Sequence, residues 1–190
     1  MNRTHTNGEL RASMVSKTVT LIGWVAKRRN LGSLVFIDLR DRTGITQVIL
    51  DEALANTVKE IRNEYILEVT GEVVLRKDPN PKLPTGEIEV LAQSVTIINN
   101  SDVPPILIQD DTDALEDTRM KFRYLDLRRP LMQKKLIQRA QIVRTMRNYL
   151  DDHGFIDVET PMLTKSTPEG SREYLVPSRV HPGEFYALAQ

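Results

Sequence analysis

The chain has 190 residues, of which 40% are hydrophobic and 27% charged, ordinary values for a globular protein that buries its own core. Its 26 basic and 26 acidic residues give a formal net charge of zero, which excludes a protein that holds nucleic acid by bulk positive charge alone. The absence of cysteine excludes disulfides, thiolate zinc sites and a cysteine nucleophile, and it suits a reducing cytoplasm.

Neither a membrane segment nor a metal site is predicted. The first 13 residues are polar, so we expect no signal peptide, and no apolar run approaches the roughly 20 residues that span a bilayer. The histidines His5, His153 and His181 lie far apart and show no metal-ligand spacing. We therefore expect a cytoplasmic protein without a bound metal in this chain.

Residues 18–50 predict three strands. In the first, Val19, Leu21 and Val25 alternate with Ile22 and Trp24, as expected for a strand with one buried face. A glycine inside this strand, at position 23, is expected to mark a sharp bend. The strands are expected at residues 18–27, 33–40 and 45–50, with turns at 30–32 and 41–44.

A short helix and two more strands complete this region. The apolar residues of 51–63 recur at helical spacing, whereas residues 65–75 and 87–98 return to strand patterns. Three prolines make residues 77–84 a loop. Three strands, a helix and two strands is the order of the OB-fold, a five-stranded barrel that commonly binds oligonucleotides.

The rest of the chain predicts a connector and a long helix. Residues 99–120 contain two adjacent prolines and an acidic run that we interpret as a solvated surface segment. Residues 131–152 form an amphipathic helix that Gly154 ends. A strand is expected at 155–159. Residues 184–190 read as the middle of another, so we expect the sequence to be cut short there.

The second strand carries a candidate site for single-stranded nucleic acid, which needs an aromatic platform, hydrogen-bonding groups and cations. Phe36 shares a strand face with Asp38 and Arg40, which favours an exposed platform over a core position. Gln47 shares parity with two isoleucines, so the pattern leaves its burial open. The basic run 27–29, followed by two more arginines, fits either a phosphate contact or a solubilising edge.

Several segments resemble a known family. They are residues 23–41, 86–90, 123–130 and 154–163, followed by 167–170 and 174–179. Together they resemble the bacterial-type aspartyl-tRNA synthetases, which are class II aminoacyl-tRNA synthetases. The first segment is shared in looser form with lysyl- and asparaginyl-tRNA synthetases, whereas Tyr-Leu-Asp-Leu-Arg-Arg-Pro combined with Thr-Pro-Glu-Gly is much more specific. The expected long helix, strand and proline match motif 1 of class II synthetases.

The resemblance implies an anticodon-binding site on the barrel. Phe36 is expected to stack on the central anticodon base, with Arg29 and Gln47 reading its edge. Glu89 is expected to face the wobble base. Arg76 is implied as another contact, although many relatives carry a second arginine at the place of Val74.

A substrate contact is also implied outside the barrel. The carboxylate of Glu169 would bind the ammonium group of the substrate aspartate. Arg128 and Arg129 could touch tRNA, but we interpret them as surface arginines. Enzymes that also charge asparagine tRNA often have histidine at position 31, so the leucine here favours an enzyme that charges aspartate tRNA alone, while Asn30 stands in place of the usual aspartate.

The resemblance also implies an architecture and a reaction. Residues 1–100 would form the OB-fold anticodon-binding domain, 101–130 a linker and hinge, and 131–190 the beginning of an α+β class II catalytic domain. The family activates aspartate with ATP and Mg²⁺ and transfers it to aspartate tRNA, as a homodimer formed through motif 1. We expect the parts that bind ATP and Mg²⁺ to lie beyond residue 190. The chain alone is then expected to hold no catalytic residue and to be inactive.

Two other functions remain open from the sequence. A free-standing tRNA- or single-strand-binding OB-fold module would explain the barrel, but it would have no use for motif 1. A lysyl- or asparaginyl-tRNA synthetase would share the first segment. The sequence at 125–130 and 167–170 speaks against both of these synthetases.

Overall fold

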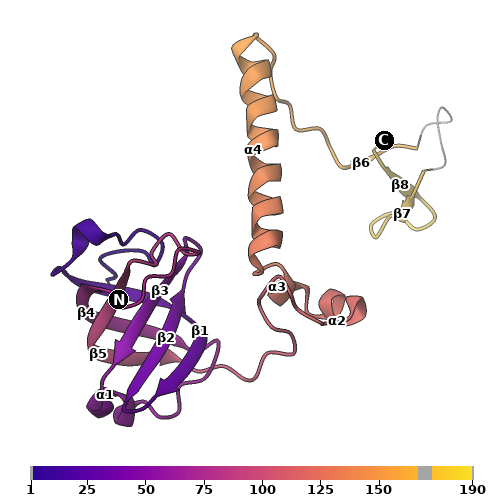
Figure 1. The fold of residues 1–190 in the computed structure, drawn as a ribbon. Coiled ribbons are helices and arrows are strands. Elements are labelled where there is room, and N and C mark those ends of the chain that lie inside the picture. The colour runs from indigo at the N-terminus through magenta and orange to yellow at the C-terminus, as the bar shows by residue number, and fades with distance from the viewer. Residues whose placement is uncertain (1, 167–172, 190) are drawn as a thin grey trace. The chain divides into compact units, whose positions relative to one another are not determined.

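The computed structural model describes residues 2–166 and 173–189 and divides the chain into two compact units, Met1–Met132 and Gln133–Gln190. The first unit contains a β-barrel followed by two short helices. The second contains most of the long helix and a small sheet (Figure 1). Within the described residues, no helix has both the length and the apolar character needed to cross a membrane.

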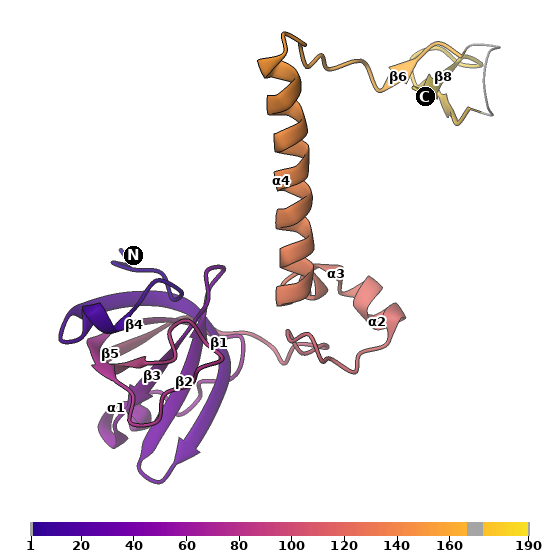
Figure 2. The same ribbon diagram turned by 45° about the horizontal axis from the view of Figure 1, so that its top comes forward.

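The barrel is closed by five strands in the order β1-β2-β3-β5-β4. Every neighbouring pair is antiparallel except β3 and β5, which run parallel. Its elements are β1 (Thr18–Leu31), β2 (Leu34–Arg40), β3 (Ile45–Leu50), α1 (Glu52–Thr57), β4 (Ile66–Leu75) and β5 (Ile88–Asn99). The predicted OB-fold and its element order are therefore confirmed. Helix α1 lies at one end of the barrel in Figures 1 and 2.

Alternate residues of each strand fill the barrel interior, as the period-2 patterns predicted. From β1 to β3 the fully buried side chains include Val19, Leu21, Val25, Ile37, Leu39 and Val48. From β4 and β5 they include Leu67, Val69, Ile88 and Val90. Leu54 and Ala55 of α1 pack against this core and cover that end of the barrel. Because the inward residues fill the core, the outward residues of the strands are available for binding.

The N-terminal segment is tied to the barrel wall by hydrogen bonds. Asn7 is fully buried; its backbone N–H donates to Asp41 Oδ2 at 2.9 Å and its Nδ2 to the Ile22 carbonyl at 3.0 Å. A Cβ on Gly23 would lie 2.5 Å from the Arg40 carbonyl oxygen and 2.8 Å from Asn7 Nδ2, so only glycine fits there. A short 3-10 helix, η1 (Ala12–Met14), then leads into β1.

The first hairpin differs from the prediction in its turn and in its register. Asn30 and Leu31 belong to β1, and the turn is made by Gly32 and Ser33, with Gly32 at a φ of 62°. The register between β1 and β2 also shifts between Val25 and Lys27, which leaves Ala26 as a β-bulge. A bulge reverses the alternation, so Arg28 pairs with the core residue Ile37.

Residues expected to form a plain linker contain two helices, α2 (Glu116–Lys121) and α3 (Arg123–Asp126). Asp126, the last residue of α3, is fully buried and accepts hydrogen bonds from Arg119 Nε at 2.9 Å and Arg123 Nη1 at 3.4 Å. Arg129 Nε lies 3.3 Å from the same carboxylate, in an ion pair without hydrogen-bond geometry. The interpretation of Arg129 as a surface arginine is wrong, because only 5% of this residue is exposed.

Part of the acidic run has a structural role that the sequence did not indicate. Both oxygens of Asp110 accept from the backbone N–H of Leu131, at 3.0 and 3.2 Å. Leu131 is the second residue of α4 (Pro130–Asp152), where N–H groups have no partner within the helix. Asp110 thus caps this helix from 21 residues away, and it is not merely a solvated residue.

The second unit consists of the rest of α4 and a three-stranded sheet. Gly154, at a φ of 80°, ends the helix as predicted: its N–H donates to the Asp151 carbonyl, and that of Phe155 to the Leu150 carbonyl. The strands β6 (Leu163–Thr164), β7 (Leu175–Pro177) and β8 (Phe185–Leu188), labelled in Figure 1, form an antiparallel sheet with β8 in the middle, which confirms the predicted last strand.

The strand expected at residues 155–159 is absent from the described structure. Residues 155–161 are exposed and form neither helix nor strand. An extended segment becomes a stable strand only when a neighbour accepts its backbone hydrogen bonds, and none of the described strands of the second unit pairs with these residues. The alternating sequence there therefore identified an extended segment but not a pairing partner.

Candidate nucleic-acid interface

The outward face of β1, β2, β3 and β5 carries two neighbouring rows of side chains. In the first row Arg29 pairs with Phe36, Phe36 with Ile49, and Ile49 with Leu91. In the second row Lys27 pairs with Asp38, and Asp38 with Gln47, whose side chain reaches Glu89. One row is therefore mainly apolar and the other polar, a combination that suits a base lying flat with its edge toward hydrogen-bonding groups.

Phe36 lies at the centre of the apolar row. It is half-buried on the outward face, while its neighbours Val35 and Ile37 point into the core. Leu91, one strand beyond Ile49, is 43% exposed. A ring supported on both sides by cross-strand neighbours, yet open to solvent, is a platform on which a base can stack.

The polar row is joined by side-chain hydrogen bonds. Arg29 Nη2 donates to Asp38 Oδ1 at 2.7 Å and to Gln47 Oε1 at 3.2 Å. Gln47 Nε2 in turn donates to Glu89 Oε2 at 2.7 Å. The structure thus places Gln47 outside the core. Three of the predicted site residues, Arg29, Gln47 and Glu89, lie in one hydrogen-bonded chain.

Arg76 lies at the edge of this network. Its Nε donates to the Ile88 carbonyl at 2.8 Å, while its Nη2 is buried without a hydrogen-bond partner in the described structure. Burial lowers the pKa of Arg76, and the nearby charges of Glu89 and Asp38 oppose that shift. Val74 pairs directly with Glu89 across β4 and β5, so an arginine at this position would stand opposite this carboxylate.

The β-bulge at Ala26 decides which arginine faces outward. Because the alternation reverses at the bulge, Arg29 pairs with Phe36 on the outward face, and Arg28 lies at the end of the barrel. There Arg28 Nη1 donates to the carbonyls of Lys59 and Ile61, both at 3.1 Å. The predicted basic patch is therefore not one surface: Arg28 holds the loop after α1, and Arg29 joins the polar row.

Arg40 also has a structural role. Its Nη2 donates to both oxygens of Glu64, at 2.8 and 3.0 Å. Glu64 is only 9% exposed and has a φ of 66°, in the left-handed region that non-glycine residues seldom adopt. A buried carboxylate at a strained position needs paired charges, and Arg40 supplies one of them.

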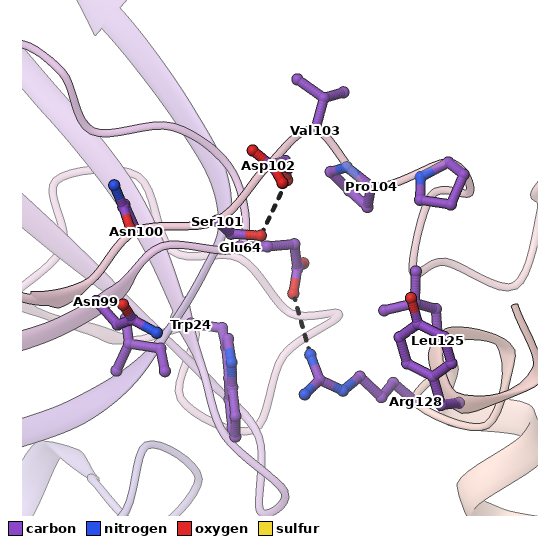
Figure 3. Close-up of a pocket in the computed structure, with 13 residues that line it drawn as sticks. Trp24, Glu64, Asn99, Asn100, Ser101, Asp102, Val103, Pro104, Leu125 and Arg128 are labelled. Atoms are coloured by element: carbon purple, nitrogen blue, oxygen red, sulfur yellow. Dashed lines mark hydrogen bonds and ion pairs between the residues drawn. The ribbon is translucent and has the colours of Figure 1, made fainter.

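The second charge comes from Arg128, which Figure 3 shows reaching toward Glu64 beside Trp24. Arg128 Nη1 lies 3.7 Å from Glu64 Oε2, and its guanidinium stacks 5.0 Å from the centre of the Trp24 ring. The Arg128 side chain is 41% exposed, in keeping with a surface arginine, but it also has a structural role that the sequence did not indicate. The signal that could have found this contact was Trp24 itself, since a large aromatic side chain on an outward strand face calls for a partner.

These residues border a pocket of about 380 Å³ between the barrel and the segment that follows it, within the first unit. Ile66, residues 99–105, Tyr124 and Leu125 complete its wall. The pocket is lined by charges of both signs, Glu64 and Arg128, and by no residue of the Phe36 row. We therefore assign the candidate interface to the outward face of β1, β2, β3 and β5.

The predicted aspartate contact, Glu169, lies outside the described residues, as does the rest of the segment 167–170. Within residues 2–166 and 173–189, no group of three acidic or histidine side chains could hold a metal ion. The described geometry therefore concerns the barrel and its nucleic-acid face.

Comparison with known proteins identifies the family. Residues 19–98 match the family described as "OB-fold nucleic acid binding domain", and residues 115–190 match "tRNA synthetases class II (D, K and N)". Over 99% of its length the chain is 55% identical to an aspartate–tRNA(Asp/Asn) ligase of Geobacillus sp. (strain WCH70). Over its full length it is 56% identical to an aspartate–tRNA ligase of Geobacillus kaustophilus. The chain belongs to the aspartyl-tRNA synthetase family.

The chain spans about a third of the length of these relatives, 33% of each. Its fold is similar to that of a putative aspartyl-tRNA synthetase from Leishmania major, with a TM-score of 0.82 and 21% identity over 99% of this chain and 39% of that one. It is also similar to asparaginyl-tRNA synthetase from Pyrococcus horikoshii, with a TM-score of 0.80 and 22% identity, over 96% of this chain and 41% of that one. The two matched families together account for both the barrel and the segment after it.

Proposed function

We propose that this chain is the anticodon-binding part and the beginning of the catalytic part of an aspartate–tRNA ligase. That enzyme activates aspartate with ATP and transfers it to aspartate tRNA. The observation that carries the proposal is the pairing of an open aromatic platform, Phe36, with a hydrogen-bonded row beside it, on an OB-fold barrel of this family. A free-standing binding module would not explain the class II segment from residue 115 onward.

Each barrel residue has a proposed role in reading the anticodon. Phe36 stacks on the central base, and Arg29 and Gln47 hydrogen-bond to its edge. Glu89 faces the wobble base, and Arg76 makes a further contact nearby. Leu31, which is 70% exposed at the end of β1, is available to the same loop and favours a ligase that charges aspartate tRNA alone.

The remaining roles follow the family. We divide the chain into the anticodon-binding domain at 1–100, the hinge at 101–130 and the first part of the catalytic domain at 131–190. Glu169 would bind the ammonium group of aspartate, whereas ATP and Mg²⁺ are assigned to no residue described in this structure. We further propose a cytoplasmic homodimer that associates through residues 131–161, because α4 exposes large apolar side chains. These include Leu136, Ile137, Val143, Met146 and Leu150.

A matched pair of arginine variants tests the barrel's proposed role. Arg29→Ala is expected to weaken binding of an aspartate tRNA anticodon stem–loop by about 1–3 kcal/mol, because it removes a charged hydrogen-bond donor from the reading face. Arg28→Ala is expected to leave binding nearly unchanged but to lower the melting temperature, since Arg28 bonds to the loop after α1. Fluorescence anisotropy and thermal melting measure the two effects. Equal losses of binding in both variants would contradict the assignment.

A further inference from the structure

Asp38 is an unexpected residue on a surface proposed to bind RNA. It lies on the outward face of β2, two residues after Phe36, and its side chain is 21% exposed. RNA carries a negative charge on every phosphate, so a carboxylate in the middle of the binding face opposes binding electrostatically. The contacts of Asp38 with neighbouring side chains indicate what function offsets this electrostatic cost.

The contact of Asp38 with Arg29 is diagonal across two strands. Arg29 pairs with Phe36 in the apolar row, whereas Asp38 is two residues further along β2 in the polar row. The 2.7 Å ion pair therefore draws the guanidinium out of its own row and over the polar one. Without Asp38, a long side chain that is 44% exposed would have many orientations available.

The position of Arg29 in turn fixes the amide of Gln47. The same nitrogen that donates to Asp38 also donates to Gln47 Oε1, so the other end of this amide, Nε2, faces Glu89 and donates to it. An amide turned the other way would place its NH₂ group against a guanidinium and its oxygen against a carboxylate. The order Asp38, Arg29, Gln47, Glu89 is therefore a single chain of hydrogen bonds with one consistent orientation.

We propose that Asp38 is a positioning residue for anticodon reading. It contacts no base itself, but holds Arg29, and through Arg29 the amide of Gln47, in the orientation that distinguishes one base from another. This inference rests on the proposed function of the barrel. It has an unusual consequence: Asp38 reduces general affinity for RNA and increases selectivity between anticodons.

The test compares two stem–loops, one with the aspartate anticodon and one in which the central base is replaced by a purine. Fluorescence anisotropy gives the dissociation constants of the full 190-residue chain for both, and their ratio measures selectivity. Asp38→Asn is expected to lower this ratio about tenfold, the usual effect of losing one charge-assisted hydrogen bond. Its affinity for the altered stem–loop is expected to stay the same or to increase, because a negative charge has been removed.

Two further variants separate positioning from simpler effects. Glu68→Gln makes the same charge change on β4, where Glu68 pairs with Ile22 and Thr96 away from the polar row, and its ratio is expected to equal that of the wild type. In an Arg29→Ala background, Asp38→Asn is expected to cause no further loss of the ratio, because Asp38 then has no guanidinium to hold.

An unchanged ratio in Asp38→Asn, or an equal weakening of both stem–loops, would overturn the positioning role. So would a loss in the Arg29→Ala background as large as in the wild type. A wild-type chain that binds both stem–loops equally would instead overturn the proposed anticodon function, and this inference with it.

Discussion

Replacing Phe36 with alanine is expected to weaken binding of the aspartate anticodon stem–loop by about 1–3 kcal/mol, or roughly 5- to 150-fold. This is the free energy usually lost when one base–aromatic stack is removed. The loss is expected in binding more than in folding, because Phe36 is half-buried on the outward face while Val35 and Ile37 fill the core.

The measurement combines anisotropy with urea unfolding of the same variants. Phe36→Tyr retains a stacking ring and is expected to bind like the wild type, so it separates loss of the ring from mere substitution at the site. If Phe36→Ala binds normally but unfolds at a much lower urea concentration, Phe36 acts as a core residue and the platform assignment fails.

Replacing Asp126 with alanine is expected to destabilise the segment that contains α2 and α3 by about 3 kcal/mol. The carboxylate is fully buried and balances three arginines, one of which, Arg129, has a side chain only 7% exposed. Removal of Asp126 leaves that guanidinium buried without a countercharge. The barrel core lies elsewhere, so its stability is expected to change little.

Hydrogen exchange at the backbone amides of Leu127 and Arg129, which bond to carbonyls of this segment, measures the effect locally. Arg123→Ala is the matched control, since this side chain is 48% exposed and its pair with Asp126 is 3.4 Å long. It is expected to cost less than about 1 kcal/mol, as solvent-exposed pairs do. Equal exchange rates in the two variants would contradict the account of the buried carboxylate.

The same network predicts a dependence on pH. Hydrogen bonding from Arg119 holds the pKa of Asp126 below its ordinary value; burial opposes this, and the charges of Arg119, Arg129 and Arg123 lower it further. A carboxyl with a depressed folded-state pKa contributes stability that is present above its unfolded pKa of about 3.9 and is lost as pH falls through the folded value. Protection of this segment is therefore expected to persist to about pH 4 and to fall below it.

The sequence was sufficient to predict the barrel because strand alternation is a local signal. Val35, Ile37 and Leu39 face the core, and Phe36, Asp38 and Arg40 face outward, as their spacing indicated. The order of strands and helix then left the OB-fold as the natural architecture. The prediction of a strand at residues 155–159 was wrong for the opposite reason, because a strand needs a pairing partner, and alternation does not reveal one.

The contacts between residues far apart in the chain could not be predicted from the sequence. Nothing in the pattern near Ala26 marked a β-bulge, so the run Lys27–Arg29 looked like one basic patch although its arginines serve different surfaces. Glu64, Arg40 and Arg128 meet from three separate segments, and charged residues give no periodic signal of their partners. The burial of Gln47 could not be predicted either, because it depends on which face of β3 points into the barrel.

Anticodon reading by this chain can be tested directly through its affinity for anticodon stem–loops. A stem–loop with anticodon GUC, which pairs with the aspartate codon GAC, is expected to bind with strong salt dependence. It is also expected to bind at least about tenfold more tightly than the same stem–loop with a purine at the central position. Selective binding of this kind would support anticodon reading by the Phe36 face. Equal affinity for the two stem–loops at every salt concentration would contradict it.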